Sequence, residues 1–336
     1  MEKLFSLIEK FCNIPAVSGN ENKLVEEIIN EIKDQKTVTY YTDNLGNLIV
    51  NKKGKNKASK KLMLDAHLDE VGIIVTFIED DGMIRFSCVG GIEVETLLCK
   101  RIRFKNATGV IGTTPIHLQE DVKATIKSTD ELLIDIGAKT KEEALKYVSL
   151  GEVGWFEGEF STFGDNMFIS RAIDDRAGVS VLVYLLLQES DYDFTCSFSV
   201  LEEVGLKGAG ASAYKIKPDV ALVIEGTTAG DILGVSEYKK VCKLNEGPAV
   251  SFMDRCAIYD KDLYNLALNS GIKAQPKSYV SGGNNSGAIQ TTAEGTKVLA
   301  LSLPTRYIHS GFSVASFSDL ENLAKLTKTL INKICE

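Results

Sequence analysis

FTCSFSVLEEVGLKGAGASAYKIKPDVALVIEG, residues 194–226, is the stretch that indicates the fold class. Residues 194–201 and 220–224 are short, mainly apolar runs of the kind that form buried strands. Residues 208–213, which lie between them, open a helix. A strand, a helix and a second strand in this order form the crossover unit of a parallel sheet. The stretch therefore predicts an α/β protein.

The same alternation continues on both sides of this unit. The apolar patterns predict strands over residues 38–41, 48–50, 62–66 and 297–303, and helices over residues 1–11, 24–32, 178–188, 260–269 and 318–334. Alternating strands and helices predict a mostly parallel sheet that is flanked by helices on both faces.

A β-rich segment interrupts this alternation between residues 72 and 160. Strands are predicted over residues 73–78, 84–88, 101–104, 109–111 and 132–134, together with one helix over residues 141–148. We therefore expect one catalytic α/β domain made of residues 1–71 and 161–336. Residues 72–160 would form an inserted domain that resembles a small barrel or sandwich.

Three local patterns have simple structural interpretations. Ser18 and Glu21 are spaced as a capping box before the helix over residues 24–32. Residues 51–61 are rich in lysine and small residues, which is most simply a solvated turn. His117 is one of three histidines and is interpreted as an ordinary surface or core residue.

Composition excludes several classes of protein. The chain has 336 residues, with 38 Lys and Arg against 46 Asp and Glu, and the net charge of −8 argues against nucleic-acid binding. Its seven cysteines contain no CxxC pair, so they are interpreted as reduced core residues, which fits a cytoplasmic protein. The longest apolar run, residues 181–187, is too short to span a membrane. Residues 1–11 resemble an amphipathic helix and not a signal peptide.

Acidic residues and histidines follow several of the predicted strands. Ligands of open α/β sheets bind at the carboxyl ends of the strands, so these side chains are expected to converge. They are His67, Asp69 and Glu70 after residues 62–66, Glu202 and Glu203 after residues 194–201, Glu225 after residues 220–224, His309 after residues 297–303, and Asp174 and Asp175 at the start of a helix.

Each of these residues also has an ordinary interpretation. Asp174 could be a helix cap, and the Glu202–Glu203 pair could lie in a solvated loop. Taken together, two imidazoles and several carboxylates without thiolates form the ligand set of a hydrolytic zinc site or a related divalent site. Of two adjacent glutamates, one could bind metal while the other carries protons.

The chain resembles the glutamyl and tetrahedral (TET) aminopeptidases, a family of co-catalytic metallopeptidases. The matching runs occur in the family's order and cover nearly the whole chain. They are SGNE at Ser18, DNLGNLIV at Asp43, AHLDEVG at Ala66, VGG at Val89, GTTPIHL at Gly112, DIGA at Asp135, AIDDRAG at Ala172, EEVGLKGA at Glu202 and LPTRYIHS at Leu303.

This resemblance implies two divalent metal ions per subunit, with zinc expected and cobalt or manganese as alternatives. His67 and Glu225 would bind one ion and Glu203 and His309 the other, while Asp174 would bridge the two. Glu202 would be the general acid and base for a bridging hydroxide, and Asp69 would orient His67.

The resemblance also implies short peptide substrates and a homo-oligomer, from a dimer up to a twelve-subunit tetrahedral shell that is assembled through the β-rich insertion. Three positions depart from the family pattern. Glu225 replaces the usual aspartate, Asn285 stands where an acid is frequent, and Ser313 stands near a frequent glutamate. The first departure keeps a carboxylate, and the other two bear on substrate preference more than on chemistry.

Two alternatives remain open at this point. One is a metal-dependent hydrolase of other amide bonds on the same scaffold, such as a deacylase. The other is a non-catalytic oligomeric binding protein, although His67, Glu202 and His309 are all present.

Overall fold

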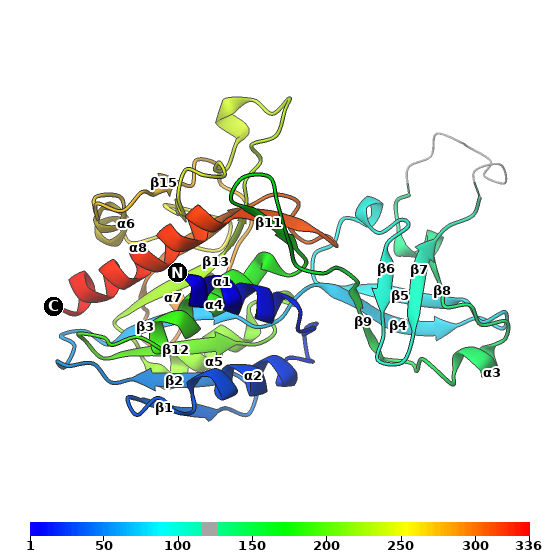
Figure 1. Cartoon of the computed structure of the whole chain (residues 1–336), viewed down its shortest axis with the longest axis horizontal. Coiled ribbons are helices and arrows are strands. Elements are labelled where there is room, and N and C mark those ends of the chain that lie inside the picture. Colours follow the sequence, from blue (N-terminus) through cyan, green and yellow to red (C-terminus); the bar gives the residue numbers. More distant parts are fainter. Residues whose placement is uncertain (116–125) are drawn as a thin grey trace.

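An eight-stranded sheet forms the centre of the α/β body, and a closed barrel lies beside it along the long axis of the molecule (Figure 1). The computed structural model describes residues 1–115 and 126–336. His117, interpreted above as an ordinary residue, and part of the GTTPIHL run lie outside these described residues.

The central four strands of the large sheet are parallel, and the outer pairs are mainly antiparallel. In spatial order the strands are β1 (Val38–Thr42), β2 (Leu48–Lys52), β12 (Phe194–Ser199), β3 (Leu62–His67), β13 (Val220–Thr228), β16 (Lys297–Thr305), β14 (Ala249–Val250) and β15 (Gln275–Pro276). Every residue of β3 and β12 is buried, because helices cover both faces. The predicted α/β class is confirmed.

Helices cover the sheet in two groups. In the first group, three helices pack against α4 (Ile173–Leu186). They are α1 (Glu2–Cys12), α2 (Asn22–Ile32) and α8 (Phe317–Cys335). The second contains α5 (Lys207–Ile216) and α7 (Ser286–Gln290), which contact each other and the central strands, while α6 (Lys261–Leu268) packs near the β14 edge. Among the described residues, no helix is both long enough and apolar enough to span a membrane.

The barrel is built from six strands with its own apolar core. In order around the barrel they are β4 (Gly72–Ile78), β5 (Ile84–Val89), β8 (Leu133–Asp135), β7 (Thr108–Gly112), β6 (Arg101–Arg103) and β9 (Val153–Phe156). Ile73, Ile102 and Ile134 are fully buried inside it. These strands fall within residues 72–160; that this segment is a separate domain for assembly stays a prediction.

Several local expectations need correction. The helix expected over residues 141–148 is a single turn, α3 (Lys141–Ala144). The Ser18–Glu21 capping box is wrong, because the Ser18 hydroxyl donates to Asp69 Oδ2 at 2.6 Å and Glu21 makes no side-chain cap. The strand expected to end at residue 224 continues to residue 228, so Glu225 lies within β13 and not after it.

A small three-stranded sheet is absent from the sequence-based expectation. It joins β10 (Ser161–Phe163), β11 (Met167–Ser170) and β17 (Ser313–Ser316), where the chain returns from the barrel to the α/β body. Each of these strands has only three or four residues, which is too short for a clear period-two pattern.

Candidate metal centre

The carboxyl ends of the central parallel strands bring the predicted site residues together. His67 is the last residue of β3 and is paired in register with Ser199, the last residue of β12. Glu202 and Glu203 lie in the loop that follows β12, and His309 lies in the loop that follows β16. The structure therefore places these residues at one edge of the sheet, as the rule for parallel strands predicts.

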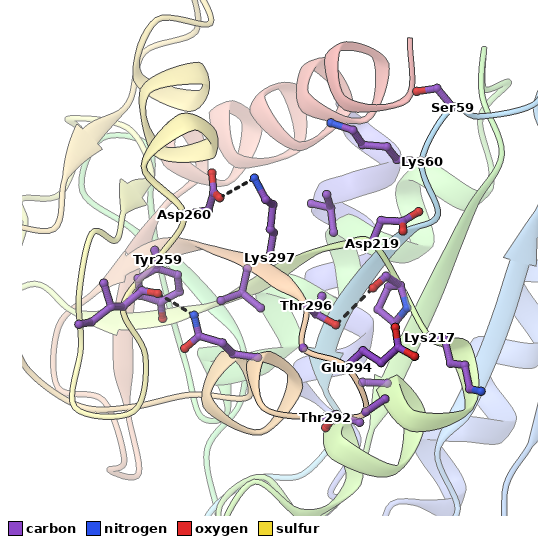
Figure 2. Close-up of a pocket in the computed structure, with 18 residues that line it drawn as sticks. Ser59, Lys60, Lys217, Asp219, Tyr259, Asp260, Thr292, Glu294, Thr296 and Lys297 are labelled. Atoms are coloured by element: carbon purple, nitrogen blue, oxygen red, sulfur yellow. Dashed lines mark hydrogen bonds and ion pairs between the residues drawn. The ribbon is translucent and has the colours of Figure 1, made fainter.

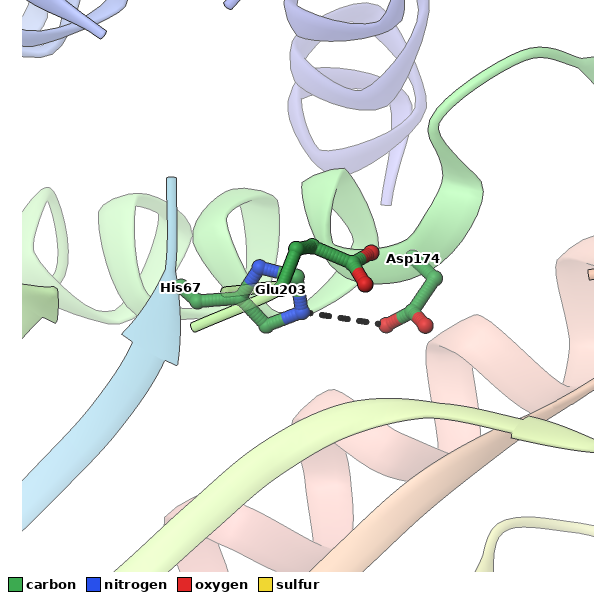
Figure 3. A group of neighbouring side chains, drawn as sticks. All are labelled: His67, Asp174 and Glu203. Atoms are coloured by element: carbon green, nitrogen blue, oxygen red, sulfur yellow. Dashed lines mark hydrogen bonds and ion pairs between the residues drawn. The ribbon is translucent and has the colours of Figure 1, made fainter. Parts of the chain in front are cut away.

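Three side chains from three separate elements meet at the centre of this edge. His67 from β3, Asp174 from the start of α4 and Glu203 from the loop after β12 each offer one ligand atom, and these atoms lie within 4.8 Å of one another (Figure 3). His67 Nε2 is 3.3 Å from Asp174 Oδ1. One nitrogen and two carboxylate oxygens at this spacing suit a divalent cation.

His309 approaches the same carboxylate from the other side. Its Nε2 atom is 3.4 Å from Asp174 Oδ2 and 3.3 Å from Glu203 Oε1. The two oxygens of Asp174 therefore face two different imidazoles. His309 Nδ1 is 2.8 Å from the carbonyl oxygen of Gly91, a residue in the loop that follows β5 of the barrel. That contact favours a proton on Nδ1 and leaves Nε2 free to act as a ligand.

Asp69 connects His67 to the loop that carries the paired glutamates. Its Oδ1 atom accepts a hydrogen bond from the backbone N–H of Glu202 at 2.9 Å, and Oδ2 accepts one from the N–H of Glu203 at 3.0 Å. Oδ1 also lies 3.5 Å from His67 Nδ1. Burial opposes ionisation of Asp69, but the His67 ring and these hydrogen bonds lower its pKa below the usual value.

The remaining carboxylates are crowded and buried. Burial and the nearby carboxylate of Asp174 raise the pKa of Glu202 to about 7 and that of Glu203 to about 8. Burial and the charge of Glu202 raise the pKa of Glu225 well above its ordinary value. Glu225 Oε1 is also buried without a hydrogen-bond partner among the described residues. A buried carboxylate oxygen without a partner is costly unless a cation neutralises it.

This donor set fits divalent cations. Imidazole nitrogens and carboxylate oxygens are their ordinary ligands, and burial together with neighbouring carboxylates raises the pKa of Glu202, Glu203 and Glu225. Glu225 is not one of the three residues whose ligand atoms converge, but the charges of Glu202, His67 and Asp174 act on its carboxyl group, and its Oε1 atom has no hydrogen-bond partner among the described residues.

Comparison with known proteins points in the same direction. Residues 46–326 match the sequence model of a family described as M42 glutamyl aminopeptidase.

The chain belongs to this aminopeptidase family.

Individual relatives agree over nearly the full length. A protein of Acetivibrio thermocellus that is assigned as an aminopeptidase is 40% identical over 341 residues, covering 99% of each chain. The aminopeptidase APDkam598 of Desulfurococcus kamchatkensis has a similar structure, with a TM-score of 0.91, 33% identity, and coverage of 100% of this chain and 98% of the other. The TET1 peptidase of Pyrococcus horikoshii gives a TM-score of 0.86 at 36% identity, covering 98% and 99%. The chain is therefore a peptide-bond hydrolase of a metal-dependent family.

Two acidic candidates of this aminopeptidase turn away from the cluster. Glu70 pairs with the buried guanidinium groups of Arg171 and Arg176. Asp175 accepts hydrogen bonds from the backbone N–H groups of His67, at 3.2 Å, and Gly178, at 2.8 Å. Both residues hold the backbone around the site.

Sequence reasoning missed two contributors to the aminopeptidase site. Ser18 donates to Asp69, and the Gly91 carbonyl contacts His309. The SGNE and VGG runs contain both residues, but nothing in their spacing indicates which atom they contact.

The departures from the family pattern have definite positions. Asn285 is fully buried, and its amide donates to Asp65 Oδ2 and to the hydroxyl of Ser199. Ser313 lies in β17 and donates to the carbonyl of Tyr307 at 3.1 Å. Ser313 also lines a small pocket with Asp174, Glu203 and His309, so it lies beside the cluster.

Proposed function

We propose that this family member is an aminopeptidase that removes the N-terminal residue of short peptides with two divalent cations held at the cluster. The observation that carries the proposal is the position of Asp174, whose two oxygens face His67 and His309 separately. A carboxylate with one imidazole at each oxygen would be suited to hold two cations together.

The ligands divide into two groups. His67 and Glu225 would hold one cation, Glu203 and His309 would hold the other, and Asp174 would be shared. The unpartnered oxygen of Glu225 supports its role as a ligand. The hydrogen bond between His309 Nδ1 and Gly91 supports the use of Nε2 by the second group. Nitrogen and oxygen donors of this kind accept zinc, cobalt or manganese, and zinc is the expected ion.

Glu202 is the proton carrier of the reaction. It lies beside the ligand Glu203, and burial raises its pKa to about 7, which suits a group that must both accept and donate a proton near neutral pH. Divalent cations held at this site would lower the pKa of a water and polarise the substrate carbonyl. Glu202 accepts the proton of the attacking water and later donates it to the leaving amine. Asp69 fixes the Glu202–Glu203 backbone in position relative to His67.

The homo-oligomer is also part of the proposal. The similar TET1 peptidase of Pyrococcus horikoshii can assemble into a tetrahedron or a large octahedral shell. In the present chain the barrel exposes large apolar side chains, including Phe77, Tyr147 and Leu150, and the loop after β13 exposes Leu233. Exposed apolar groups on two projecting segments suit contacts between copies of the chain.

Hydrolysis of a panel of aminoacyl-p-nitroanilides, after loading with zinc, cobalt or manganese, tests this function. We expect release of nitroaniline that stops on chelation and returns when metal is added. N-acetylated versions of the same compounds are the matched control, because an aminopeptidase requires a free α-amine. Release of acetate from the acetylated compounds, without release of nitroaniline from the free ones, would favour the deacylase alternative, and no turnover of any compound would favour a binding protein.

A further inference from the structure

We propose that a cavity at the amino-terminal end of β3, opposite the metal centre, binds a small polyphosphate anion. This cavity of about 680 Å³ is called the lysine groove here. Six lysines line it: Lys36, Lys52, Lys53, Lys57, Lys60 and Lys61. Its volume falls within the range of roughly 300–1,000 Å³ that is typical of pockets for small ligands.

The charge of the lysine groove is not neutralised by the described part of the protein. Asp193 is the only acid among the described residues that line it, and Asp193 Oδ1 already accepts a hydrogen bond from the backbone of Gly54 at 2.8 Å. Five of the six lysines, all except Lys52, are exposed and have no ion pair or side-chain hydrogen bond within residues 1–115 and 126–336. Lys55, which does not line the groove, differs because it pairs with Glu189 at 3.1 Å. A positive cavity on a chain with a net charge of −8 is a local feature that favours an anion.

Lys52 contributes a buried charge to the wall. It is 3% exposed, and its ammonium donates to Thr37 Oγ1 at 2.9 Å and to the carbonyl of Leu186 at 2.7 Å. Leu186 is the last residue of α4, so the ammonium also satisfies the carboxyl end of that helix. Both hydrogen-bond acceptors are neutral, and the ammonium of Lys52 forms no ion pair within residues 1–115 and 126–336.

The loop that carries most of these lysines is anchored by its backbone. The N–H groups of Lys55 and Asn56 donate to the carbonyls of Ser190 and Asp191, that of Ser59 to the carbonyl of Cys335, and that of Lys61 to Asp219 Oδ2. At Gly54, a Cβ atom would lie 2.2 Å from the carbonyl carbon of Tyr192, so only glycine allows this close approach. The lysines thus project from a fixed frame, which lowers the entropy lost on binding. A solvated turn does not require such anchoring.

A larger cavity nearby provides a comparison. It measures about 890 Å³ and is lined by 18 residues (Figure 2). Its three lysines are Lys60, Lys217 and Lys297, and its three acids are Asp219, Asp260 and Glu294. Lys297 pairs with Asp260 at 3.1 Å, so the charges of this cavity compensate one another. Of these two cavities, the lysine groove is the one whose described residues carry a large excess of one charge, with six lysines against one acid.

Lysine ammonium groups bind phosphate well, because each ammonium is a compact point charge. A ligand with two or more phosphate groups carries enough negative charge to contact several of the unpaired lysines. The net charge of −8 opposes the approach of a long nucleic acid, so we infer a small molecule. Free polyphosphate chains and nucleotides share this chemistry.

The groove is separate from the metal centre. Leu62 begins β3 at the groove, and His67 ends β3 at the cluster, about 17 Å away for six extended residues. The loop lies on the side of the α/β body that faces away from the barrel (Figure 1). Binding at the groove does not depend on the proposed aminopeptidase chemistry.

Calorimetric titration of the metal-loaded protein with tripolyphosphate and with ATP tests the proposal. The variant Lys53→Gln/Lys57→Gln should bind at least about tenfold more weakly than the wild type, since two charge-assisted contacts are lost. Lys261→Gln/Lys333→Gln is the matched control, because both lysines are exposed and lack ion pairs among the described residues, and it should bind like the wild type. All three proteins keep the proposed metal ligands, so anion contacts with the cations contribute equally. Equal cleavage of an aminoacyl-nitroanilide by the three proteins would establish that they are folded.

Equal affinity for the two compounds would identify a phosphate chain as the ligand, and tighter binding of ATP would identify a nucleotide. Either result supports the proposal. Absence of binding to wild type, equal binding by all three proteins, or tighter binding of a DNA oligonucleotide or of polyglutamate would overturn it.

Discussion

The side-chain amide of Asn285 donates a 2.8 Å hydrogen bond to Oδ2 of Asp65, and both residues are fully buried. The family resemblance described above implies an acid where this chain has Asn285. In this chain the carboxylate is that of Asp65 on β3, two residues before His67, and Asn285 supplies the amide that donates to it.

Asn285→Asp should therefore destabilise the protein, although it restores the residue frequent in the family. Two buried carboxyl groups would then face each other in place of a carboxylate and an amide donor, at a cost of about 1–3 kcal/mol. Urea denaturation measures the loss. Asp65→Asn in the same chain restores one amide and one carboxyl, so the double variant should recover most of the stability. If the two effects simply add, the two side chains are not coupled.

Glu202→Gln should leave folding and metal content unchanged and lower kcat by about 10²–10⁴-fold, the usual contribution of a general acid or base. The amide keeps the size of the side chain but cannot carry the proton. Steady-state kinetics together with elemental analysis measure both properties. A variant with bound metal and a wild-type kcat would remove Glu202 from the proposed mechanism.

Glu225→Gln should raise the thermal stability of the metal-free protein and weaken metal binding in the metal-loaded protein. In the metal-free protein it removes a buried carboxyl group whose oxygen has no partner among the described residues, so thermal stability should rise. In the metal-loaded protein it removes a ligand, so one of the two cations should be lost first on dialysis. Melting temperature and metal content before and after chelation test this pair of expectations, with the exposed Glu9→Gln as control. Unchanged metal affinity would mean that Glu225 is not a ligand.

Replacing residues 72–160 by a short linker should give a soluble α/β body that no longer assembles, since the apolar groups exposed on the barrel would be absent. All eight strands of the large sheet come from outside this segment, so its core should persist. Sedimentation measures assembly, and circular dichroism measures folding. An unchanged oligomer would place the contacts elsewhere, for example on the loop that carries Leu233.

Arg176→Met should destabilise the protein by about 3–5 kcal/mol, the usual cost of breaking a buried ion pair from one side. The guanidinium is fully buried and donates to the carbonyls of Phe11, Leu68 and Ile14 and to Glu70. Denaturant titration measures the loss. Arg306→Met is a useful comparison, because that arginine pairs with Asp231 in a partly exposed position and should cost less. Equal losses for the two variants would contradict the role of burial.

Much of this arrangement could be predicted from the sequence because parallel strands impose a direction. Once residues 62–66 and 194–201 are assigned as strands, the histidine and the acids that follow them must reach the same edge of the sheet. Features that depend on contacts between distant segments could not be predicted. Nothing in the spacing of Ser18 shows that its hydroxyl turns to Asp69 and not to its own helix. The strands of the small sheet are similarly too short to have a period of their own.

The contact between the Gly91 carbonyl and His309 has a consequence for sequence drift and for hybrid proteins. A main-chain oxygen survives any substitution, and a Cβ atom at position 91 would lie 3.7 Å from the imidazole, an ordinary separation, so this position is free to vary. The preceding Gly90 is not, because it has a φ of +85° and a Cβ there would come within 2.7 Å of Val71. A chimera that exchanges the insertion with that of a relative should therefore retain the histidine contact only where the donor sequence keeps glycine at the first of these two positions.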